Sequence, residues 1–249
     1  MNVSLNVLER SRDPPMNRAT SKIPAKAILF DIDGTLFDSK DAFYFMIRDV
    51  FEETGWPLPK RDDVVKLVGR TNDYIANELI PPEMKHPEFV KHWMSRVERL
   101  WVDQYLPAYV KLYPGAKQGL TELRRRGFRL AVVTNGSAKE IPLYLRQGQV
   151  DHLIDLVVTA DDVPTPKPSP EPIVYACDRL GVEKPDCLYV GDTWMDAESA
   201  SRAGVRCVLT TWGVGAIEEL RNYSHVAIVR SFEELLDLVE LRDVSPRES

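Results

Sequence analysis

Two aspartates directly after an apolar run are the first residues in this chain whose types and spacing suggest chemistry. The segment Ala27–Ser39 reads AILFDIDGTLFDS, with Asp31 and Asp33 between AILF and a Gly-Thr pair. Residues i and i+2 of an extended segment face the same way, so the two carboxylates are expected to lie side by side. A buried carboxylate without a partner is strongly disfavoured. The pair therefore lies either on a solvated turn or opposite a positively charged group.

Three further polar stretches each follow a short apolar run. VVTNGS contains Thr134 and Asn135, TADDVPTPKPSPEP contains Lys167, and YVGDTWMDAES contains Asp192 and Asp196. In open parallel sheets, ligands bind at the carboxyl ends of the strands. The sequence therefore predicts that several carboxylates, one lysine, a hydroxyl and an amide meet at one edge of a sheet.

The elements that must position these residues alternate between strands and helices. Short apolar runs that stop at polar turns are typical of strands buried on both faces, and we expect them at Ala25–Phe30, Phe128–Val133, Leu156–Thr159, Cys187–Val190 and Arg206–Leu209, with an edge strand in Tyr223–Val229. Helical patterns lie at Ala116–Arg126, Glu140–Gln147, Glu171–Leu180 and Asp196–Ala203, and a terminal helix with a capping box is expected at Ser231–Leu241. This alternation predicts an α/β fold with a parallel sheet flanked by helices.

A helical block interrupts this pattern after the first strand. Residues 40–111 contain amphipathic segments and several prolines but no convincing strand, which indicates an inserted all-helical cap domain. We divide the chain into a disordered tail (1–24), a core (25–39 and 112–241), a cap (40–111) and a second tail (242–249), with hinges near Phe37–Asp41 and Leu112–Gly115. We assign the bulky cap residues to core packing rather than to a substrate cage: Phe43, Phe45, Met46, Ile47, Trp93, Trp101 and Tyr105.

Composition limits the class of protein and of partner. The chain has 249 residues, a net charge of −6, and no apolar run near the ~20 residues that a membrane helix needs. We therefore expect no nucleic-acid partner and no membrane partner. The number of cysteines is odd, and the spacing of Cys177, Cys187 and Cys207 fits no metal motif. With no secretory signal in the first residues, they are expected to be buried thiols of a cytoplasmic protein.

Four motifs in order, DIDGTL, VVTNGS, KPSPEP and GDTWMD, resemble those of the haloacid dehalogenase-like superfamily. The similarity covers about residues 25–241 and lies in the branch with a helical cap after the first strand. DIDGTLFDS followed by such a cap is similar to phosphoglycolate phosphatase-like enzymes. The resemblance implies a Rossmann-like core and Mg²⁺-dependent hydrolysis of a small phosphorylated metabolite through an aspartyl-phosphate.

The resemblance also implies roles for the acids. Asp31 is the expected nucleophile, and Asp33 the expected acid for the leaving group and base for the incoming water. Asp31 and Asp192 would hold Mg²⁺ through carboxylate oxygens, with the backbone carbonyl of Asp33 added by the family pattern. Asp196 would orient these ligands from outside the coordination sphere, and Gly34 would give the turn its conformational freedom.

Phosphate binding is assigned to a lysine, a hydroxyl and a backbone amide. Lys167 would pair with Asp31 and one phosphate oxygen, while Thr134 and the backbone N–H of Asn135 would bind another. Arg70 is a candidate substrate contact, with a solvated surface arginine as the alternative.

Two other functions remain open from sequence. A sugar phosphomutase of the same superfamily usually has a histidine at the start of the first cap helix, where this chain has Phe43. A non-catalytic phospho-ligand-binding module has no need of Asp33. Asp33 also counts against dehalogenases, which lack this aspartate, and against the family's ATPases, which carry threonine there. A phosphonatase would need a cap lysine, and nothing marks Lys40, Lys60 or Lys66 for that role. Oligomeric state is left open.

Overall fold

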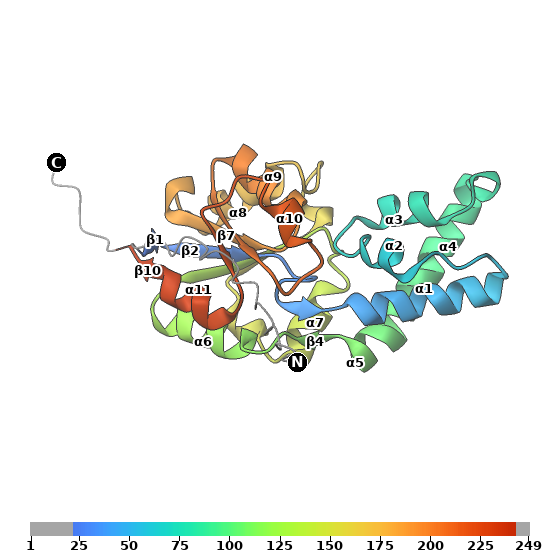
Figure 1. Cartoon of the computed structure of the whole chain (residues 1–249), viewed down its shortest axis with the longest axis horizontal. Helices are drawn as coiled ribbons and strands as arrows, with labels where there is room; N and C mark the ends of the chain where they lie inside the picture. The colour runs from blue at the N-terminus through green and yellow to red at the C-terminus, as the bar shows by residue number, and fades with distance from the viewer. Residues whose placement is uncertain (1–21, 243–249) are drawn as a thin grey trace, which may run out of the picture.

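The computed structural model of the chain describes residues 22–242 (Figure 1). The proposed tails, 1–24 and 242–249, lie almost entirely outside the described residues. Within residues 22–242, the fold confirms the predicted class: a parallel α/β core with an inserted block of helices.

The central sheet has six parallel strands in the order β6-β5-β2-β7-β8-β9. Their bounds are β2 (Ala27–Phe30), β5 (Arg129–Val133), β6 (Leu156–Val158), β7 (Cys187–Gly191), β8 (Arg206–Thr210) and β9 (Ala227–Val229). Each predicted strand is present within a few residues, because buried parallel strands are nearly continuous apolar runs. The first strand, β2, lies in the middle of the sheet, between β5 and β7.

Helices cover both faces of this sheet. Ile28 and Phe30 of β2 face the helices α6 (Ala116–Arg125) and α11 (Phe232–Leu238), and the alternate residues of β2 face α8 (Glu171–Leu180) and α9 (Trp194–Ala203). The remaining core helices are α7 (Ile141–Gln147), α10 (Ile217–Leu220) and the short 3₁₀ turns η3 (Asp151–Leu153), η4 (Ala160–Asp162) and η5 (Lys184–Asp186). Alternation of side chains along a strand thus gives two apolar layers.

The ends of the core differ from the prediction. The first strand is broken at Lys26 into β1 (Ile23–Ala25) and β2, and the terminal helix ends at Leu238 rather than at Leu241. The last three of those residues form β10 (Val239–Leu241), which pairs in parallel with β1. Ser231 does cap the helix, accepting from the N–H of Glu234. The Glu234 carboxylate bonds the N–H of Arg230 instead of closing a capping box.

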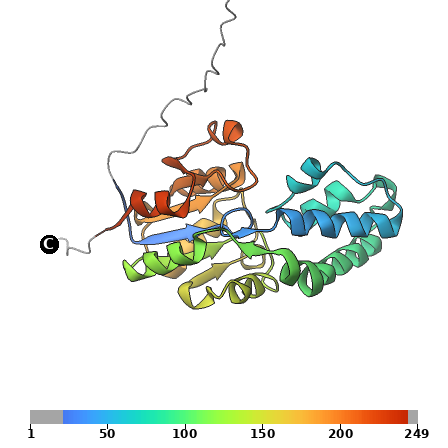
Figure 2. The same cartoon turned by 60° about the horizontal axis from the view of Figure 1, so that its bottom comes forward.

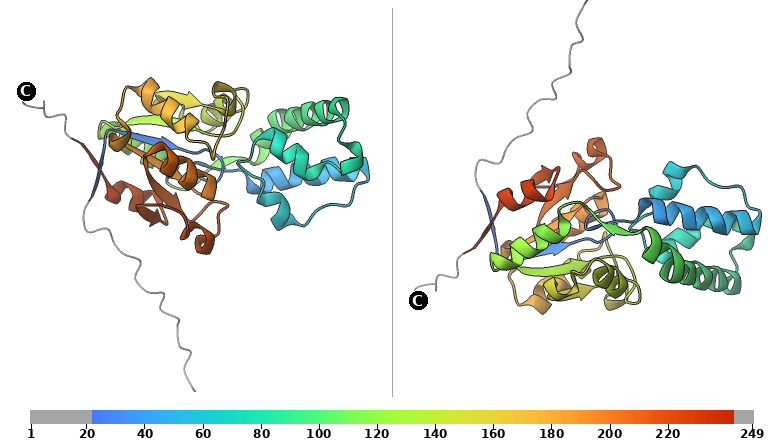
Figure 3. Two further views of the ribbon diagram at one scale, coloured as in Figure 1. Left: turned by 90° about the horizontal axis from the view of Figure 1, so that it is seen from above. Right: turned by 90° about the horizontal axis from the view of Figure 1, so that it is seen from below.

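The inserted block consists of helices, as the sequence predicted. It contains α1 (Lys40–Thr54), α2 (Arg61–Val65), α3 (Asn72–Leu79), η1 (Pro82–Met84), α4 (Pro87–Leu100), the π-helical turn η2 (Trp101–Tyr105) and α5 (Leu106–Tyr109). Figure 2 and the two views of Figure 3 show these helices to one side of the sheet, beyond the carboxyl ends of its strands. The exact division of the chain at residues 40 and 111 stays a prediction.

Two very short strands join the helical block to the core. β3 (Phe37–Asp38) and β4 (Lys111–Leu112) pair antiparallel, with Phe37 opposite Leu112. The sequence predicted connections at these two places but no strand, since a two-residue strand leaves no periodic pattern. Both crossings between cap and core therefore run side by side.

Two further expectations can be compared with the structure. Cys177, Cys187 and Cys207 are free and buried, as predicted. Among residues 22–242, no helix is both long enough and apolar enough to cross a membrane.

Candidate active site

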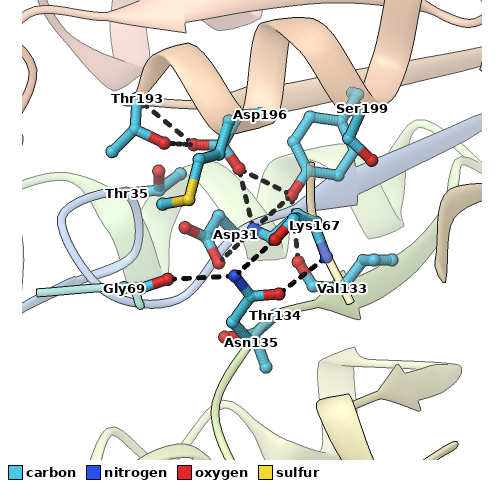
Figure 4. Close-up of polar contacts among 12 residues, drawn as sticks. Asp31, Thr35, Gly69, Val133, Thr134, Asn135, Lys167, Thr193, Asp196 and Ser199 are labelled. Atoms are coloured by element: carbon cyan, nitrogen blue, oxygen red, sulfur yellow. Dashed lines mark hydrogen bonds and ion pairs between the residues drawn. The ribbon is translucent and has the colours of Figure 1, made fainter. Parts of the chain in front are cut away.

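Most of the predicted polar residues are seen together in Figure 4, at the carboxyl ends of the central strands: Asp31, Thr134, Asn135, Lys167 and Asp196. Asp31 directly follows β2, Thr134 follows β5, and Asp192 follows β7. Lys167 comes from the long loop between β6 and α8. Because β5, β2 and β7 are neighbours in the sheet, residues up to 161 positions apart in sequence meet in one place.

Lys167 is the positive centre of this cluster. Its Nζ lies 2.9 Å from a carboxylate oxygen of Asp31 and 2.7 Å from one of Asp196, and the lysine is buried. Burial alone would lower the pKa of Lys167, but the two carboxylates raise it above its usual value. The lysine is therefore charged at neutral pH, and it is the positively charged group that the sequence predicted as one of two possible environments for Asp31.

Asp196 is held by groups around it rather than exposed to a ligand. One carboxylate oxygen bonds Lys167 and, at 3.0 Å, the hydroxyl of Tyr189. The other accepts from the backbone N–H and the hydroxyl of Thr193, at 2.9 and 2.7 Å. This capping box starts α9 at Trp194, two residues before the predicted start. Although burial acts in the opposite direction, Lys167 keeps the pKa of Asp196 below its usual value.

Asp192 is completely buried and bonded on both oxygens. It accepts from the Thr35 hydroxyl at 2.8 Å and from the N–H of Val214 at 2.7 Å. Burial, reinforced by the charge of Asp196, raises the pKa of Asp192 to about 7. Gly34 faces this carboxylate with a φ of 84°, and a Cβ there would lie 2.2 Å from an Asp192 oxygen. Glycine is thus required both for conformation and for space.

Three carboxylates share one small volume. Atoms of Asp31, Asp192 and Asp196 all lie within 4.8 Å of one another. Burial raises the pKa of Asp31 well above its usual value; Lys167 opposes this, and the other two acids add to it. One lysine does not neutralise three acids, so the donor set fits a divalent cation with oxygen ligands. Asp31 and Asp192 would hold it, since the Asp196 carboxylate is already paired with Lys167 at 2.7 Å and Asp192 is paired with no cationic side chain among residues 22–242.

Asp33 lies on the cap side of Asp31. Its Oδ1 accepts from the Tyr144 hydroxyl at 2.8 Å, and its side chain lines a cavity of about 70 Å³ between cap and core. Burial raises the pKa of Asp33, and the nearby hydroxyls of Ser39 and Tyr144 offset part of that effect. A raised pKa suits a carboxyl group that has to donate a proton.

Thr134 and Asn135 are both buried at the end of β5. The Thr134 hydroxyl accepts from the N–H of Gly136 at 3.1 Å. The Asn135 side chain bonds the backbone of Lys167 twice and also donates to the carbonyl of Gly69 in the cap, at 3.2 Å. The sequence predicted a role only for the backbone N–H of Asn135. The link that its side chain makes between Lys167 and the cap was not predicted.

Arg70 lies at the junction of cap and core instead of on an open surface. Its guanidinium is 5.1 Å from the ring centre of Tyr74 and 5.2 Å from that of Trp194, and Nη1 contacts the sulfur of Met195 at 2.9 Å. Its Nε is buried without a hydrogen-bond partner among the described residues. The structure thus places Arg70 in the wall of the same cavity as Asp33.

The cavity changes the interpretation of some cap residues. Phe43, Met46, Trp93 and Trp101 are buried, as expected for core packing, but all four also line the cavity. The Trp93 indole N–H is buried and lacks a hydrogen-bond partner among residues 22–242. These side chains therefore both build the cap and face the space beside Asp33.

Three contact residues were not predicted. Tyr189 accepts from Lys167 at 2.9 Å, and its single proton is shared between the carbonyl of Val133 and Asp196. Tyr144 donates to Asp33, and Thr35 donates to Asp192. Each lies in or beside an apolar run that was assigned to core packing or to a turn. The one signal in the sequence is that a buried tyrosine hydroxyl needs a partner.

Comparisons with known proteins agree with this arrangement. A family model described as haloacid dehalogenase-like hydrolase matches residues 28–210. The phosphoglycolate phosphatase of Nitrosospira multiformis is 29% identical over 222 residues, which are 88% of this chain and 97% of that protein. That of Rhodobacter capsulatus is 31% identical over 219 residues, 87% of this chain and 97% of the other. A solved structure described as a predicted phosphoglycolate phosphatase from Haemophilus somnus is 26% identical, with a TM-score of 0.79 and coverage of 86% and 97%.

Proposed function

Since this chain belongs to the haloacid dehalogenase-like hydrolase family, we propose that it is a Mg²⁺-dependent phosphatase that hydrolyses a small phosphorylated metabolite through an aspartyl-phosphate. The names of its relatives support a phosphatase. The main support for an aspartyl-phosphate mechanism is the buried pair of Asp31 and Lys167 at the centre of the acidic cluster, with Lys167 Nζ 2.9 Å from Asp31 Oδ1. We also propose the cytoplasm as its location, given three free, buried thiols in the described residues.

In the first step, a carboxylate oxygen of Asp31 attacks phosphorus and the bond from phosphorus to the leaving oxygen breaks. The carboxyl group of Asp33 gives its proton to that oxygen, so the product leaves as a neutral alcohol. Lys167, the Thr134 hydroxyl and the backbone N–H of Asn135 bind the phosphoryl oxygens. These donors stand ready before the reaction because each is buried and fixed by its neighbours.

In the second step, the Asp33 carboxylate takes a proton from a water molecule. The water oxygen attacks phosphorus, the bond to Asp31 breaks, and inorganic phosphate leaves. When bound by Asp31 and Asp192, Mg²⁺ would neutralise negative charge on the phosphoryl group and on Asp31. Asp33 is then protonated again and ready for the next substrate.

The cavity suggests what kind of alcohol leaves. Its volume of about 70 Å³ suits a small group, and Asp33 stands in its wall. The Arg70 Nε and the Trp93 indole N–H are buried donors without partners among residues 22–242. Leaving a buried donor unpaired costs about 1–3 kcal/mol. We therefore propose Arg70 and Trp93 as contacts to acceptor atoms on the leaving group.

The alternatives have less support. Phe43, where a phosphomutase usually has histidine, lines the cavity with an apolar ring and offers no proton. A pure binding module gives no reason for Asp33 to be held by a hydroxyl beside the cavity. Hydrolysis is therefore the function we place first.

The proposal is tested by turnover of p-nitrophenyl phosphate and of a panel of phosphorylated metabolites with Mg²⁺. We expect phosphate release by the wild type and background activity for Asp31→Asn. Asp178→Asn, which changes an exposed carboxylate on α8, is the matched control and should keep full activity. Normal turnover by Asp31→Asn at saturating Mg²⁺ would overturn the proposal.

A further inference from the structure

We propose that Tyr144 is a positioning residue for Asp33, fixing which carboxyl oxygen of that acid faces the leaving group. This inference rests on the proposed function. Tyr144 lies on α7, 111 residues after Asp33, and its hydroxyl donates to Asp33 Oδ1 at 2.8 Å. The tyrosine is only 1% exposed, and like Asp33 it lines the cavity between cap and core.

The ring of Tyr144 is held from three parts of the fold. Phe37, in the connecting strand β3, packs edge-on with the ring centres 5.2 Å apart. Trp101, in the cap, has its ring centre 6.3 Å away. The helix α7 supplies the backbone, with the Tyr144 N–H bonded to the carbonyl of Glu140. A ring packed on these sides keeps its hydroxyl at one point.

That fixed point decides the orientation of the acid. A tyrosine hydroxyl has a single proton to donate, and Tyr144 gives it to Oδ1. Among the described residues this is the one hydrogen bond to the Asp33 side chain, since the Ser39 hydroxyl has no partner, and Oδ2 is the oxygen left to exchange protons. In the proposed reaction, Oδ2 gives its proton to the leaving oxygen and later takes one from water. The proton of Tyr144 stays on Tyr144 throughout, so this residue positions and does not itself transfer.

Holding a reacting group in place increases the reaction rate, because its conformational entropy is lost when the enzyme folds and not when the transition state forms. An unheld Asp33 would sample orientations in which Oδ2 does not face the leaving oxygen. The penalty should therefore depend on the leaving group. Alkyl phosphates need a proton from Asp33, whereas p-nitrophenolate leaves without one.

The test is Tyr144→Phe, which removes only the hydroxyl. We expect the first-turnover rate for ethyl phosphate to fall about fivefold to tenfold, as for loss of one buried hydrogen bond to the neutral acid. The first-turnover rate for p-nitrophenyl phosphate should change less than about twofold. Hydrolysis of the phosphoenzyme also uses Asp33, so p-nitrophenol should appear as a burst followed by a slower steady rate.

Tyr105→Phe is the matched control. Tyr105 is also buried and also donates to a carboxylate, that of Asp49, but it does so inside the cap. It should give neither the burst nor the change in leaving-group preference, even where its loss of thermal stability equals that of Tyr144→Phe.

A double variant separates positioning from general damage. In an Asp33→Asn background, Tyr144→Phe should have no further effect on ethyl phosphate, because the group it positions is gone. The inference is wrong if Tyr144→Phe keeps the wild-type ratio of the two first-turnover rates, or if its effect persists in that background. Should Tyr144→Phe not fold, Tyr144→Leu, which also lacks a donor, is judged by the same ratio. Full activity of Asp31→Asn would instead refute the proposed function itself.

Discussion

The side chain of Asn135 pairs with the backbone of Lys167 in both directions. Its Oδ1 accepts from the Lys167 N–H at 2.9 Å, and its Nδ2 donates to the Lys167 carbonyl at 3.1 Å. The same Nδ2 reaches the carbonyl of Gly69 in the cap. One amide thus fixes the main chain of the lysine that faces Asp31 and also contacts the cap.

Asn135→Ala should therefore reduce both stability and activity. It leaves the buried N–H and carbonyl of Lys167 unpaired, which costs about 1–3 kcal/mol in the free energy of unfolding. Because Lys167 loses its fixed position, kcat should fall about tenfold or more. Urea unfolding and phosphate release measure the two effects. Asn77→Ala, which removes an exposed amide paired with Lys85, should alter neither, and equal behaviour of the two variants would contradict this role.

Activity should depend on a divalent cation. EDTA should abolish phosphate release and added Mg²⁺ should restore it, because one lysine does not balance three acids within 4.8 Å. Titration calorimetry should detect Mg²⁺ binding to the wild type and none to Asp192→Asn. Full activity in metal-free buffer would refute the proposed cation site. Binding by the variant equal to that of the wild type would exclude Asp192 as a ligand.

The stability of the fold should fall as pH rises through neutrality, in part because of Glu140. Burial raises the pKa of this carboxyl from 4.5 to about 7. The folded protein thus holds the proton more tightly than the unfolded chain, and this stabilisation is complete below about pH 4.5 and lost as pH rises through about 7. Glu140→Gln cannot ionise and can still accept from the Ser137 N–H.

The free energy of unfolding of Glu140→Gln, relative to that of the wild type, should increase between pH 4.5 and pH 8 by on the order of 1–3 kcal/mol. Urea denaturation at the two pH values measures this. A difference between the two proteins that does not change with pH would show that Glu140 titrates normally. Glu171→Gln, at the exposed start of α8, is a suitable control and should show no such trend.

The cysteines should be unreactive until the protein unfolds. Cys177, Cys187 and Cys207 are free and buried, so a thiol reagent should label none of them rapidly in the native state. In denaturant, three thiols per chain should react without prior reduction. Rapid native labelling would place at least one of them at an accessible surface, and fewer than three thiols in denaturant would indicate oxidation.

The positions of the acids and of Lys167 could be predicted because residue type, order and strand ends all point to the same edge. Asp31 and Asp192 each follow a run of apolar residues, and a parallel sheet brings such ends together whatever their distance in sequence. Tyr189 and Tyr144 could not be found in this way. In a buried strand or helix, a tyrosine has the same pattern as any core aromatic, and only the folded structure reveals what its hydroxyl meets.

The ends of elements were also beyond the sequence. The segment Ser231–Leu241 reads SFEELLDLVEL, and no glycine or proline marks where the helix stops at Leu238. Val239 becomes a strand because it can pair with Ile23, more than 200 residues earlier. Similarly, the pairing of Phe37 with Leu112 depends on a partner distant in sequence and not on local pattern. Such boundaries are decided by tertiary contacts that outweigh local preference.

The pairing of β1 with β10 has a practical consequence for engineering. Ile23 lies opposite Val239, and the N–H of Arg242 bonds the carbonyl of Ala25, so the first and last described strands lie side by side. Since β1 precedes β2, whose far end carries Asp31, both strands lie at the opposite side of the sheet from the acids (Figure 1). A short linker that joins Arg242 directly to Lys22 would thus close the chain on the side of the sheet away from the acids, which would permit circular permutation of the described core.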